Sequence, residues 1–352
     1  MRKASFEFLK TLVEAPSPSG FEAPARAIYK AYCERFADEV TSDVMGNCIA
    51  AVNPGGYPRI MLAGHMDEVG FMVKYIDDNG YLFFDQIGGV DPAVATAQRV
   101  WIQGKKGPVL GLVGRTAIHL TPPEERGKAA KLTDMWLDIG AKDKKEAEEL
   151  VAVGDPLTYT WGFQELRNEL ICCRGFDDKV GSFVVAEALR LLAEKKPQAA
   201  VFAVATVQEE VGLRGARTSA YGLDPQIGVA VDVTFATDYP SADKKKVGDI
   251  EMGKGPVLSR GANISPIVFE GIKAAATKAK LPVQFEGAPG GTGTDANAIQ
   301  LTRAGVATAL VSIPNRYMHS PVEVCSLKDL QNAAKLLAEY CASVPKDIEL
   351  RL

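Results

Sequence analysis

The order of the apolar segments constrains the fold of this chain more than any other feature of its sequence. Apolar runs rich in Ala and Val alternate with helical patterns in the second half of the chain. The runs lie at residues 200–207, 227–233 and 307–313, and the helical patterns lie at residues 179–194, 266–279 and 327–343. Strands that are apolar throughout are buried on both faces, and their alternation with helices is typical of parallel pairing. We therefore expect an α/β fold, with a mixed, mostly parallel sheet covered by helices on both faces.

Earlier in the chain, one segment has a different pattern of apolar residues. Between Gly70 and Gly162 the apolar stretches are short and often alternating, and Gly and Pro separate them. This pattern is typical of a small β-rich module. The sequence thus predicts an α/β domain formed by residues 1–69 and 163–352, interrupted by a β-rich module at residues 70–162.

Composition and charge exclude several classes of function. The 352 residues carry a net charge of −4, without the basic stripe that nucleic-acid binding favours. No apolar run reaches the roughly 18 residues that a membrane helix needs, and the N-terminus becomes acidic too early for a signal peptide. The six cysteines are scattered and form no Cys-x-x-Cys pair, as expected for reduced core residues. We therefore expect a cytoplasmic protein that binds neither nucleic acid nor membrane.

Acidic and histidine residues follow several of the predicted strands. These residues are His65 and Asp67, Glu209 and Glu210, Asp232, and, in a turn after the last strand, His319. Asp177 lies directly before a predicted long helix, where the positive end of the helix favours a carboxylate. In open α/β sheets, ligands bind beyond the carboxyl ends of the strands. We therefore expect these side chains to converge in one cleft.

Such a convergence requires positive charge. Several carboxylates in one cleft would repel each other and raise each other's pKa, and divalent cations would remove that repulsion. Two imidazoles and three carboxylates favour zinc, with cobalt or manganese as alternatives, over calcium or magnesium, which prefer oxygen ligands. The sequence therefore predicts two divalent metal ions, held by His65, Asp177, Glu210, Asp232 and His319.

Each histidine also has a simpler explanation. His65 could be a loop residue paired with Asp67, and His319 could be an ordinary turn residue. However, the chain has only three histidines, and two of them fall at these positions, which favours the metal site. The third, His119, lies in the β-rich segment between apolar neighbours and is interpreted as structural.

Glu209 and Glu210 raise a separate question, because neighbours in an extended strand point to opposite faces. At a strand end that turns near Gly212, the backbone can bend and direct both side chains into one cavity. One carboxylate can then bind metal while the other remains free as a base. The alternative is a solvated acidic loop, neutralised by Arg214 and Arg217.

Six motifs along the chain carry a resemblance to a known family. They are Gly64-His65-Met66-Asp67, Phe176-Asp177-Asp178-Lys179-Val180-Gly181, Gln208-Glu209-Glu210-Val211-Gly212, Asp232-Val233-Thr234, Gly293-Thr294-Asp295-Ala296 and His319-Ser320-Pro321. In this order, and over nearly the whole chain, they resemble the motifs of the tetrahedral aminopeptidases. These are glutamyl and deblocking aminopeptidases with two cocatalytic metal ions.

The resemblance implies how the metal ligands divide. His65 and Asp232 would hold one ion, Glu210 and His319 would hold the other, and Asp177 would bridge the two.

The resemblance also implies roles for residues beside the ligands. Glu209 would act as the general base, and Asp67 would orient the imidazole of His65. The peptide bond between Asp177 and Asp178 would be cis.

Assembly and substrates follow from the same resemblance. The inserted module would be a PDZ-like dimerisation domain, and dimers would assemble into a hollow dodecamer, so the expected partners are short peptides and further copies of the chain. Two residues depart from the family pattern: Phe235 stands where many relatives have His, and Lys179 stands where Arg is common. Lysine keeps the charge but loses the bidentate fork of arginine. Neither departure affects the predicted metal ligands.

We therefore expect a metalloaminopeptidase that removes N-terminal residues from short peptides with a metal-activated water. The alternatives are a deacylase or carboxypeptidase with the same two-metal site, a glycosidase, as some relatives carry an endoglucanase label, and a metal-stabilised scaffold without turnover. A glycosidase needs no metal, and only an aminopeptidase needs a free N-terminal amine. Acidic, basic and neutral preferences share these motifs, so the sequence leaves the preferred N-terminal residue open.

Overall fold

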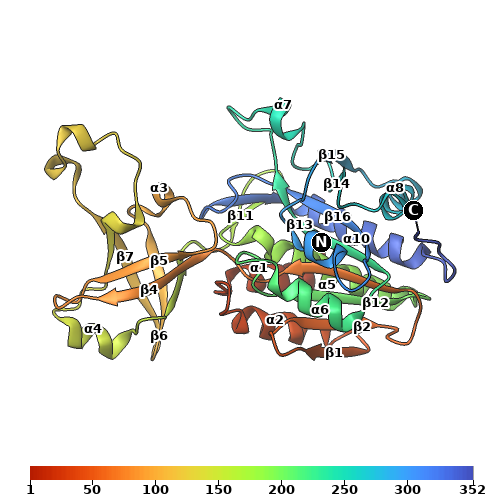
Figure 1. Cartoon of the computed structure of the whole chain (residues 1–352), viewed down its shortest axis with the longest axis horizontal. Coiled ribbons are helices and arrows are strands. Elements are labelled where there is room, and N and C mark those ends of the chain that lie inside the picture. The colour runs from red at the N-terminus through yellow and green to blue at the C-terminus, as the bar shows by residue number, and fades with distance from the viewer. Residues whose placement is uncertain (352) are drawn as a thin grey trace.

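An α/β unit and a β-barrel at its side make up the protein (Figure 1). The computed structural model describes residues 1–351. An eight-stranded sheet runs through the α/β unit in the order β1-β2-β12-β3-β13-β16-β14-β15. Its strands are β1 (Glu39–Ser42), β2 (Cys48–Val52), β12 (Ala200–Thr206), β3 (Arg59–His65), β13 (Ile227–Phe235), β16 (Ala307–Asn315), β14 (Val257–Gly261) and β15 (Gln284–Ala288).

The centre of this sheet is parallel and its flanks are not. β12, β3, β13 and β16 run in one direction. β2 and β14 pair antiparallel to this central group, and the outer strands β1 and β15 pair antiparallel and parallel to their neighbours, respectively. The sheet is therefore mixed, as expected, and its four central strands end at the same edge.

Helices cover both faces of the sheet, as the continuous apolar strands predict. One face carries α1 (Lys3–Glu14), α2 (Ala23–Cys33), α5 (Phe176–Lys195), α8 (Pro266–Ala279) and α10 (Leu327–Ser343), and the other carries α6 (Arg214–Leu223) and α9 (Asp295–Gln300). Successive side chains of strand β3 pack alternately into the hydrophobic cores on the two faces of the sheet. Ile60 and Leu62 face the first group of helices, whereas Met61 and Ala63 face the second.

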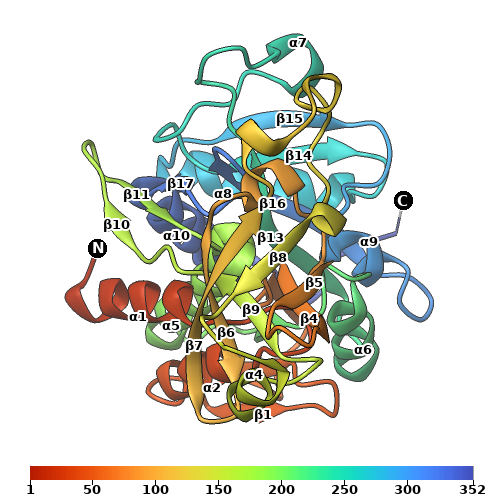
Figure 2. The same ribbon diagram turned by 90° about the vertical axis from the view of Figure 1, so that its left-hand side faces the viewer.

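The barrel is closed and has a core of its own. Its order is β4-β5-β8-β7-β6-β9, and Phe71, Val100, Leu137 and Leu157 are among the side chains that fill it. The strands are β4 (Gly70–Ile76), β5 (Leu82–Ile87), β8 (Met135–Asp138), β7 (Gly107–Arg115), β6 (Arg99–Gly104) and β9 (Pro156–Tyr159), accompanied by α3 (Pro92–Ala95), α4 (Lys144–Leu150) and 3₁₀ turns at Ile118–Leu120, Pro123–Glu125 and Leu132–Asp134. Figure 2 looks onto the barrel from its outer side, with the sheet and its helices behind it.

A third, small sheet joins two distant parts of the chain. It has the order β10-β11-β17, formed by Gln164–Glu165, Leu170–Cys173 and Glu323–Ser326. β11 leads into α5, and β17 follows the turn that contains His319. The antiparallel pairing of β11 with β17 therefore brings the start of α5 close to that turn.

The remaining helix, α7 (Lys244–Val247), lies in a loop after β13. Within residues 1–351, no helix combines the length and the apolar character needed to cross a bilayer. All six cysteines are unpaired in the structure, as the sequence predicts.

Candidate metal centre

The predicted site residues meet at the carboxyl edge of the central strands. His65 is the last residue of β3, and Asp232 lies near the end of β13. Glu209 and Glu210 follow β12, whose Thr206 is paired with His65. Because these strands are parallel, their ends deliver all four side chains to one place. His65, Asp177, Glu209, Glu210, Asp232 and His319 line a single cavity of about 410 Å³.

Asp177 lies between the two imidazoles. Its Oδ1 is 3.1 Å from Nε2 of His65, and its Oδ2 is 3.1 Å from Nε2 of His319. The other two carboxylates lie one on each side, with Oε1 of Glu210 3.3 Å from His319 Nε2 and Oδ1 of Asp232 4.0 Å from His65 Nε2. A carboxylate that faces two imidazoles through its two oxygens has the geometry to bridge two cations.

The start of α5 departs from helical geometry where it carries these carboxylates. Asp177 and Asp178 both have non-helical backbone angles, and the peptide bond between them is cis, as the resemblance implies. Asp178 Oδ2 accepts a hydrogen bond of 3.1 Å from the backbone N–H of His65. Asp178 thus ties the end of β3 to the start of α5, while Asp177 points into the cavity.

Each imidazole has a fixed protonation pattern. Nδ1 of His65 lies 3.0 Å from the carbonyl oxygen of Asp67, and Nδ1 of His319 lies 2.6 Å from the carbonyl oxygen of Gly89, in the loop after β5. A carbonyl oxygen only accepts, so Nδ1 carries the hydrogen in both rings. Nε2 is therefore the ring atom that faces the cavity, where a metal ion in place of the proton would meet its lone pair.

The side chain of Asp67 supports the turn that carries the two glutamates. Its Oδ1 accepts from the backbone N–H of Glu209 at 3.1 Å, and its Oδ2 accepts from that of Glu210 at 3.2 Å and from the hydroxyl of Ser19 at 2.7 Å. Oδ1 also lies 3.5 Å from Nδ1 of His65. Just before this turn, Gln208 has a φ of +56°. The bent backbone lets both glutamates line the same cavity.

Glu209 occupies a different place from Glu210. Its Oε2 is 3.8 Å from Nε2 of His65, and the residue is only 8% exposed. The alternative of a solvated acidic loop does not fit this burial. Arg214 does not neutralise Glu209 but donates to the side-chain carbonyl of Gln208 at 3.3 Å.

Burial and the neighbouring charges strongly shift the pKa values of the groups in this cluster. Burial, followed by repulsion from Asp232 and Asp295, raises the pKa of Glu209 to about 10. Burial also raises the pKa of Asp232 well above its ordinary value. Although burial acts to lower it, the pKa of His319 rises to about 11 because Asp177 and Glu210 lie beside it. The protein alone would therefore balance this cluster with protons, and bound cations would replace them.

The donor set fits such cations. Two sets of ligand atoms lie close enough to share an ion, one from His65, Asp177 and Glu210 and one from His65, Asp178 and Asp232. Oε1 of Glu210 is buried and makes no hydrogen bond within the described part of the chain, as suits an atom that binds metal. Mixed imidazole and carboxylate ligands are typical of zinc and neighbouring first-row ions.

The sequence analysis of the site does not identify two carboxylates that form hydrogen bonds around it. Glu323 is buried in β17 and accepts from the backbone N–H groups of Asp177 and His319, both at 2.9 Å. Asp295, at the start of α9, accepts from the hydroxyl of Thr206 at 2.5 Å. Asp295 belongs to the motif Gly293-Thr294-Asp295-Ala296, and this motif could have indicated it. Glu323 lies in no such motif, and only the pairing of β17 with β11 reveals it.

The two departures from the family pattern have different positions. Lys179 lies outside the cavity and is fully buried, with Nζ 2.9 Å from Oε1 of Glu68 and within hydrogen-bonding distance of the carbonyl oxygens of Val13 and Ala15. It is therefore part of the packing beneath the site. Phe235 lines the cavity and is 55% exposed. The third histidine, His119, is exposed beside the barrel.

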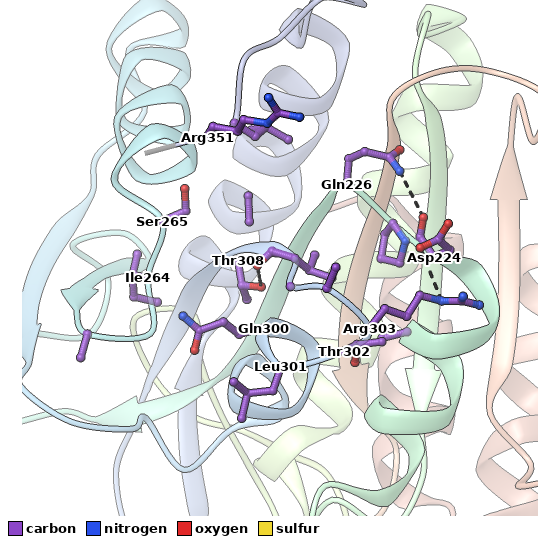
Figure 3. Close-up of a pocket in the computed structure, with 18 residues that line it drawn as sticks. Asp224, Gln226, Ile264, Ser265, Gln300, Leu301, Thr302, Arg303, Thr308 and Arg351 are labelled. Carbon is purple, nitrogen blue, oxygen red and sulfur yellow. Dashed lines mark hydrogen bonds and ion pairs between the residues drawn. The ribbon is translucent and has the colours of Figure 1, made fainter.

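A larger cavity of about 760 Å³ lies at the opposite, amino ends of β13 and β16 (Figure 3). Asp224 at this cavity pairs with Arg303 at 3.4 Å, and its carbonyl oxygen accepts from Gln226 at 3.3 Å. Among residues 1–351, its lining contains no histidine and only one carboxylate side chain, that of Asp224. Its residues therefore lack the ligands for a metal centre, and the smaller cavity is the candidate active site.

Comparison with known proteins points to one family. The sequence pattern of the M42 glutamyl aminopeptidases matches residues 46–336. The lysyl aminopeptidase of Pyrococcus furiosus is 40% identical over 334 residues, which cover 94% of this chain and 95% of that protein. Among solved structures, the TET aminopeptidase of Thaumarchaeota archaeon SCGC AB-539-E09 is similar with a TM-score of 0.92 and 39% identity, over 97% of this chain and 96% of that chain. The TET1 peptidase of Pyrococcus horikoshii, which can assemble into a tetrahedron or a large octahedral shell, has a TM-score of 0.87 and 32% identity, over 97% of this chain and 100% of that chain.

Proposed function

Because the chain belongs to the M42 glutamyl aminopeptidase family, it is a metal-dependent aminopeptidase, and we propose which of its residues carry out the reaction. The observation that carries the proposal is the position of Asp177, whose two oxygens each lie 3.1 Å from a different imidazole. Asp177 would be the ligand shared by two divalent ions. His65 and Asp232 would complete one binding site, and Glu210 and His319 would complete the other. Zinc suits these ligands best, with cobalt and manganese as alternatives.

Glu209 is the general base. When bound, two divalent ions lower the pKa of a water molecule and polarise the scissile carbonyl. Glu209 lines the cavity without being needed as a ligand, so its carboxylate accepts the proton of the attacking water and donates it to the leaving amine. Asp67 is a positioning residue, because it holds the backbone N–H groups of Glu209 and Glu210 and contacts the ring of His65.

The charge of the cavity favours an aminopeptidase over a carboxypeptidase. A carboxypeptidase needs a cationic side chain for the terminal carboxylate of its substrate, but among the described residues no Lys or Arg lines this cavity. A surplus of carboxylates suits a free α-amino group instead. The remaining alternatives are less well supported, because a glycosidase has no use for the two imidazoles and a scaffold has none for Glu209.

We also propose a role for the barrel. Residues 70–162 form a PDZ-like dimerisation domain inserted between the catalytic segments 1–69 and 163–352, and dimers of this cytoplasmic enzyme assemble into a dodecamer. Trp101, Leu110 and Leu112 support this role, because they are 39%, 44% and 48% exposed on the barrel. Trp101 is paired with Leu110 across β6 and β7, so these apolar side chains share one outer face.

The test is hydrolysis of unblocked and N-acetylated aminoacyl substrates by the metal-loaded enzyme, before and after chelation. We expect cleavage of unblocked substrates only, lost on chelation. Glu209→Gln should retain two metal ions per chain but lose about 10²–10⁴-fold in kcat, whereas Glu270→Gln, at an exposed ion pair on α8, should behave as wild type. Cleavage of acetylated substrates would favour a deacylase, and full activity of Glu209→Gln would exclude Glu209 as the base.

A further inference from the structure

One carboxylate in the candidate active site takes no part in the proposed metal binding. Glu286 lies on β15, at the far edge of the sheet from β3, and lines the same cavity as the ligands. Its Oε2 accepts a hydrogen bond of 2.8 Å from Thr234, and its Oε1 accepts one of 2.5 Å from Ser259. Two hydroxyl donors fix the position of this carboxylate. A carboxylate has about four acceptor sites, so two remain for another donor.

In the part of the chain that the structure describes, no cationic side chain forms an ion pair with Glu286. Among residues 1–351, the cavity lining contains neither Lys nor Arg. Among the described lining residues, the basic side chains are His65 and His319, which face the carboxylates of the metal centre. A fixed, uncompensated carboxylate in a cavity favours a cationic ligand group.

The space between Glu286 and the metal centre suits an extended aliphatic chain. Thr234, which donates to Glu286, lies two residues beyond Asp232 on β13. Residues two apart in a strand point to the same face and are roughly 6.6–6.8 Å apart. Apolar side chains line the cavity along with them, from Val233, Leu310 and Met318. A side chain that starts at the metal centre and reaches Glu286 therefore needs an apolar stem several carbons long.

A second polar group in the cavity is the hydroxyl of Ser312. Ser312 lies directly beside Asp232 in the register of β16 and β13 and is 1% exposed. Its hydroxyl is buried and makes no hydrogen bond within the part of the chain that the structure describes. A buried hydroxyl without a partner is costly, and a ligand N–H group would satisfy it. An α-amino group bound beside Asp232 has such N–H donors to offer.

From these observations, and resting on the proposed aminopeptidase function, we propose that Glu286 selects substrates with an N-terminal lysine or arginine. The α-amino group of the substrate lies at the metal centre, and the side chain runs along β13 from Asp232 toward Thr234. Its cationic end binds Glu286, while Ser312, beside Asp232, accepts from the α-amino group. An acidic side chain is repelled by the same carboxylate, and a short apolar one leaves it unpaired.

The test compares lysyl, norleucyl and glutamyl p-nitroanilides with the metal-loaded enzyme. Norleucine has an aliphatic side chain without the ammonium group, so the ratio of kcat/KM for lysyl over norleucyl substrate reports the contact with Glu286. This ratio does not depend on the fraction of folded enzyme. We expect wild type to prefer the lysyl substrate, Glu286→Gln to lower the ratio about 10- to 100-fold, and Glu286→Lys to favour the glutamyl substrate. Glu270→Gln is the matched control and should leave the ratio unchanged.

The other outcomes separate this inference from the function on which it rests. A wild-type enzyme that cleaves norleucyl or glutamyl substrates as well as lysyl ones would overturn the preference and leave the aminopeptidase intact. A lysyl preference that survives in Glu286→Gln would overturn the assignment to Glu286. Hydrolysis of none of the three substrates would overturn the proposed function itself, and this inference with it.

Discussion

Glu68, beneath the candidate site, is buried between two cations. Its Oε1 lies 2.9 Å from Nζ of Lys179, and both of its oxygens accept from Arg174. Burial acts to raise the pKa of Glu68, but Arg174 and Lys179 hold it below its ordinary value. Since this pKa is lowered in the folded state, Glu68 contributes stability above its unfolded pKa of about 4.3, and the contribution is lost as the pH falls through the lower, folded value.

Glu68→Gln should therefore cost about 3–5 kcal/mol of unfolding free energy at pH 7, because it leaves two buried cations without their partner. The difference from wild type should shrink as the pH falls below about 4 and through the lower, folded pKa, beneath which Glu68 is protonated in both states. Urea unfolding of the metal-free proteins at both pH values measures this effect. Glu270→Gln, at an exposed ion pair, should change stability by less than about 1 kcal/mol. A neutral-pH difference for Glu68→Gln as small as that of the control would contradict the prediction.

Also at the residue scale, the sequence predicts the candidate site residues at the strand ends better than it predicts the side chains that hydrogen-bond to them. His65, Asp232 and the two glutamates follow apolar strands, and parallel strands bring their ends together whatever the loops do. Glu323 supports Asp177 from 146 positions away along the chain. No local pattern encodes that contact, because it depends on the pairing of β11 with β17.

Among the elements, β3 and α5 are in unusually close contact. A Cβ atom on Gly64 would lie 2.3 Å from the carbonyl carbon of Gly181 and 2.5 Å from the backbone nitrogen of Ser182. Only a glycine at position 64 lets the helix that carries Asp177 approach the strand that carries His65. The Gly64-His65 pair of the sequence motif thus combines a proposed metal ligand with the glycine that allows the close approach of α5.

Gly64→Ala should therefore separate these two elements and damage the metal centre. We expect a loss of about 1–3 kcal/mol of stability from overpacking, together with at least about tenfold weaker metal binding. Metal titration and thermal unfolding measure the two effects. Gly55→Ala, at a site with no heavy atom near the added Cβ, is the control. Wild-type metal affinity in Gly64→Ala would show that α5 can shift without moving Asp177.

The long, strongly patterned elements follow from the sequence, but the short ones do not. The bounds expected for α8 and α10 agree with the structure. Helix α6 contains two glycines, a threonine and a serine among its ten residues, so its intrinsic helix propensity is low. It forms because Ala216 and Ala220 pack against the sheet. The antiparallel pairing of β14 with β16 is likewise set by packing and has no signal in the short strand itself.

For the whole molecule, the exposed apolar side chains on the barrel predict the surface through which copies of the chain associate. Replacing both Leu110 and Leu112 by Asp would put two charges on the exposed apolar face of β7. Charges cannot be buried unpaired in an interface, so the double variant should shift the mass distribution in sedimentation velocity toward the monomer. Val44→Asp, at a fully exposed position on the α/β unit, should leave the distribution unchanged. An unaltered assembly in the double variant would exclude this face as an interface.

The contact of Gly89 with His319 limits how this architecture can diverge. The loop after β5 belongs to the barrel, yet the carbonyl oxygen of Gly89 fixes which nitrogen of the His319 imidazole carries the hydrogen. Gly88 in the same loop would meet Glu210 at 3.3 Å if it carried a Cβ. A descendant that exchanged the barrel for an unrelated module would lose this carbonyl, and with it the ring orientation of His319. The α/β unit and the barrel therefore depend on each other at this contact, although each has a core of its own.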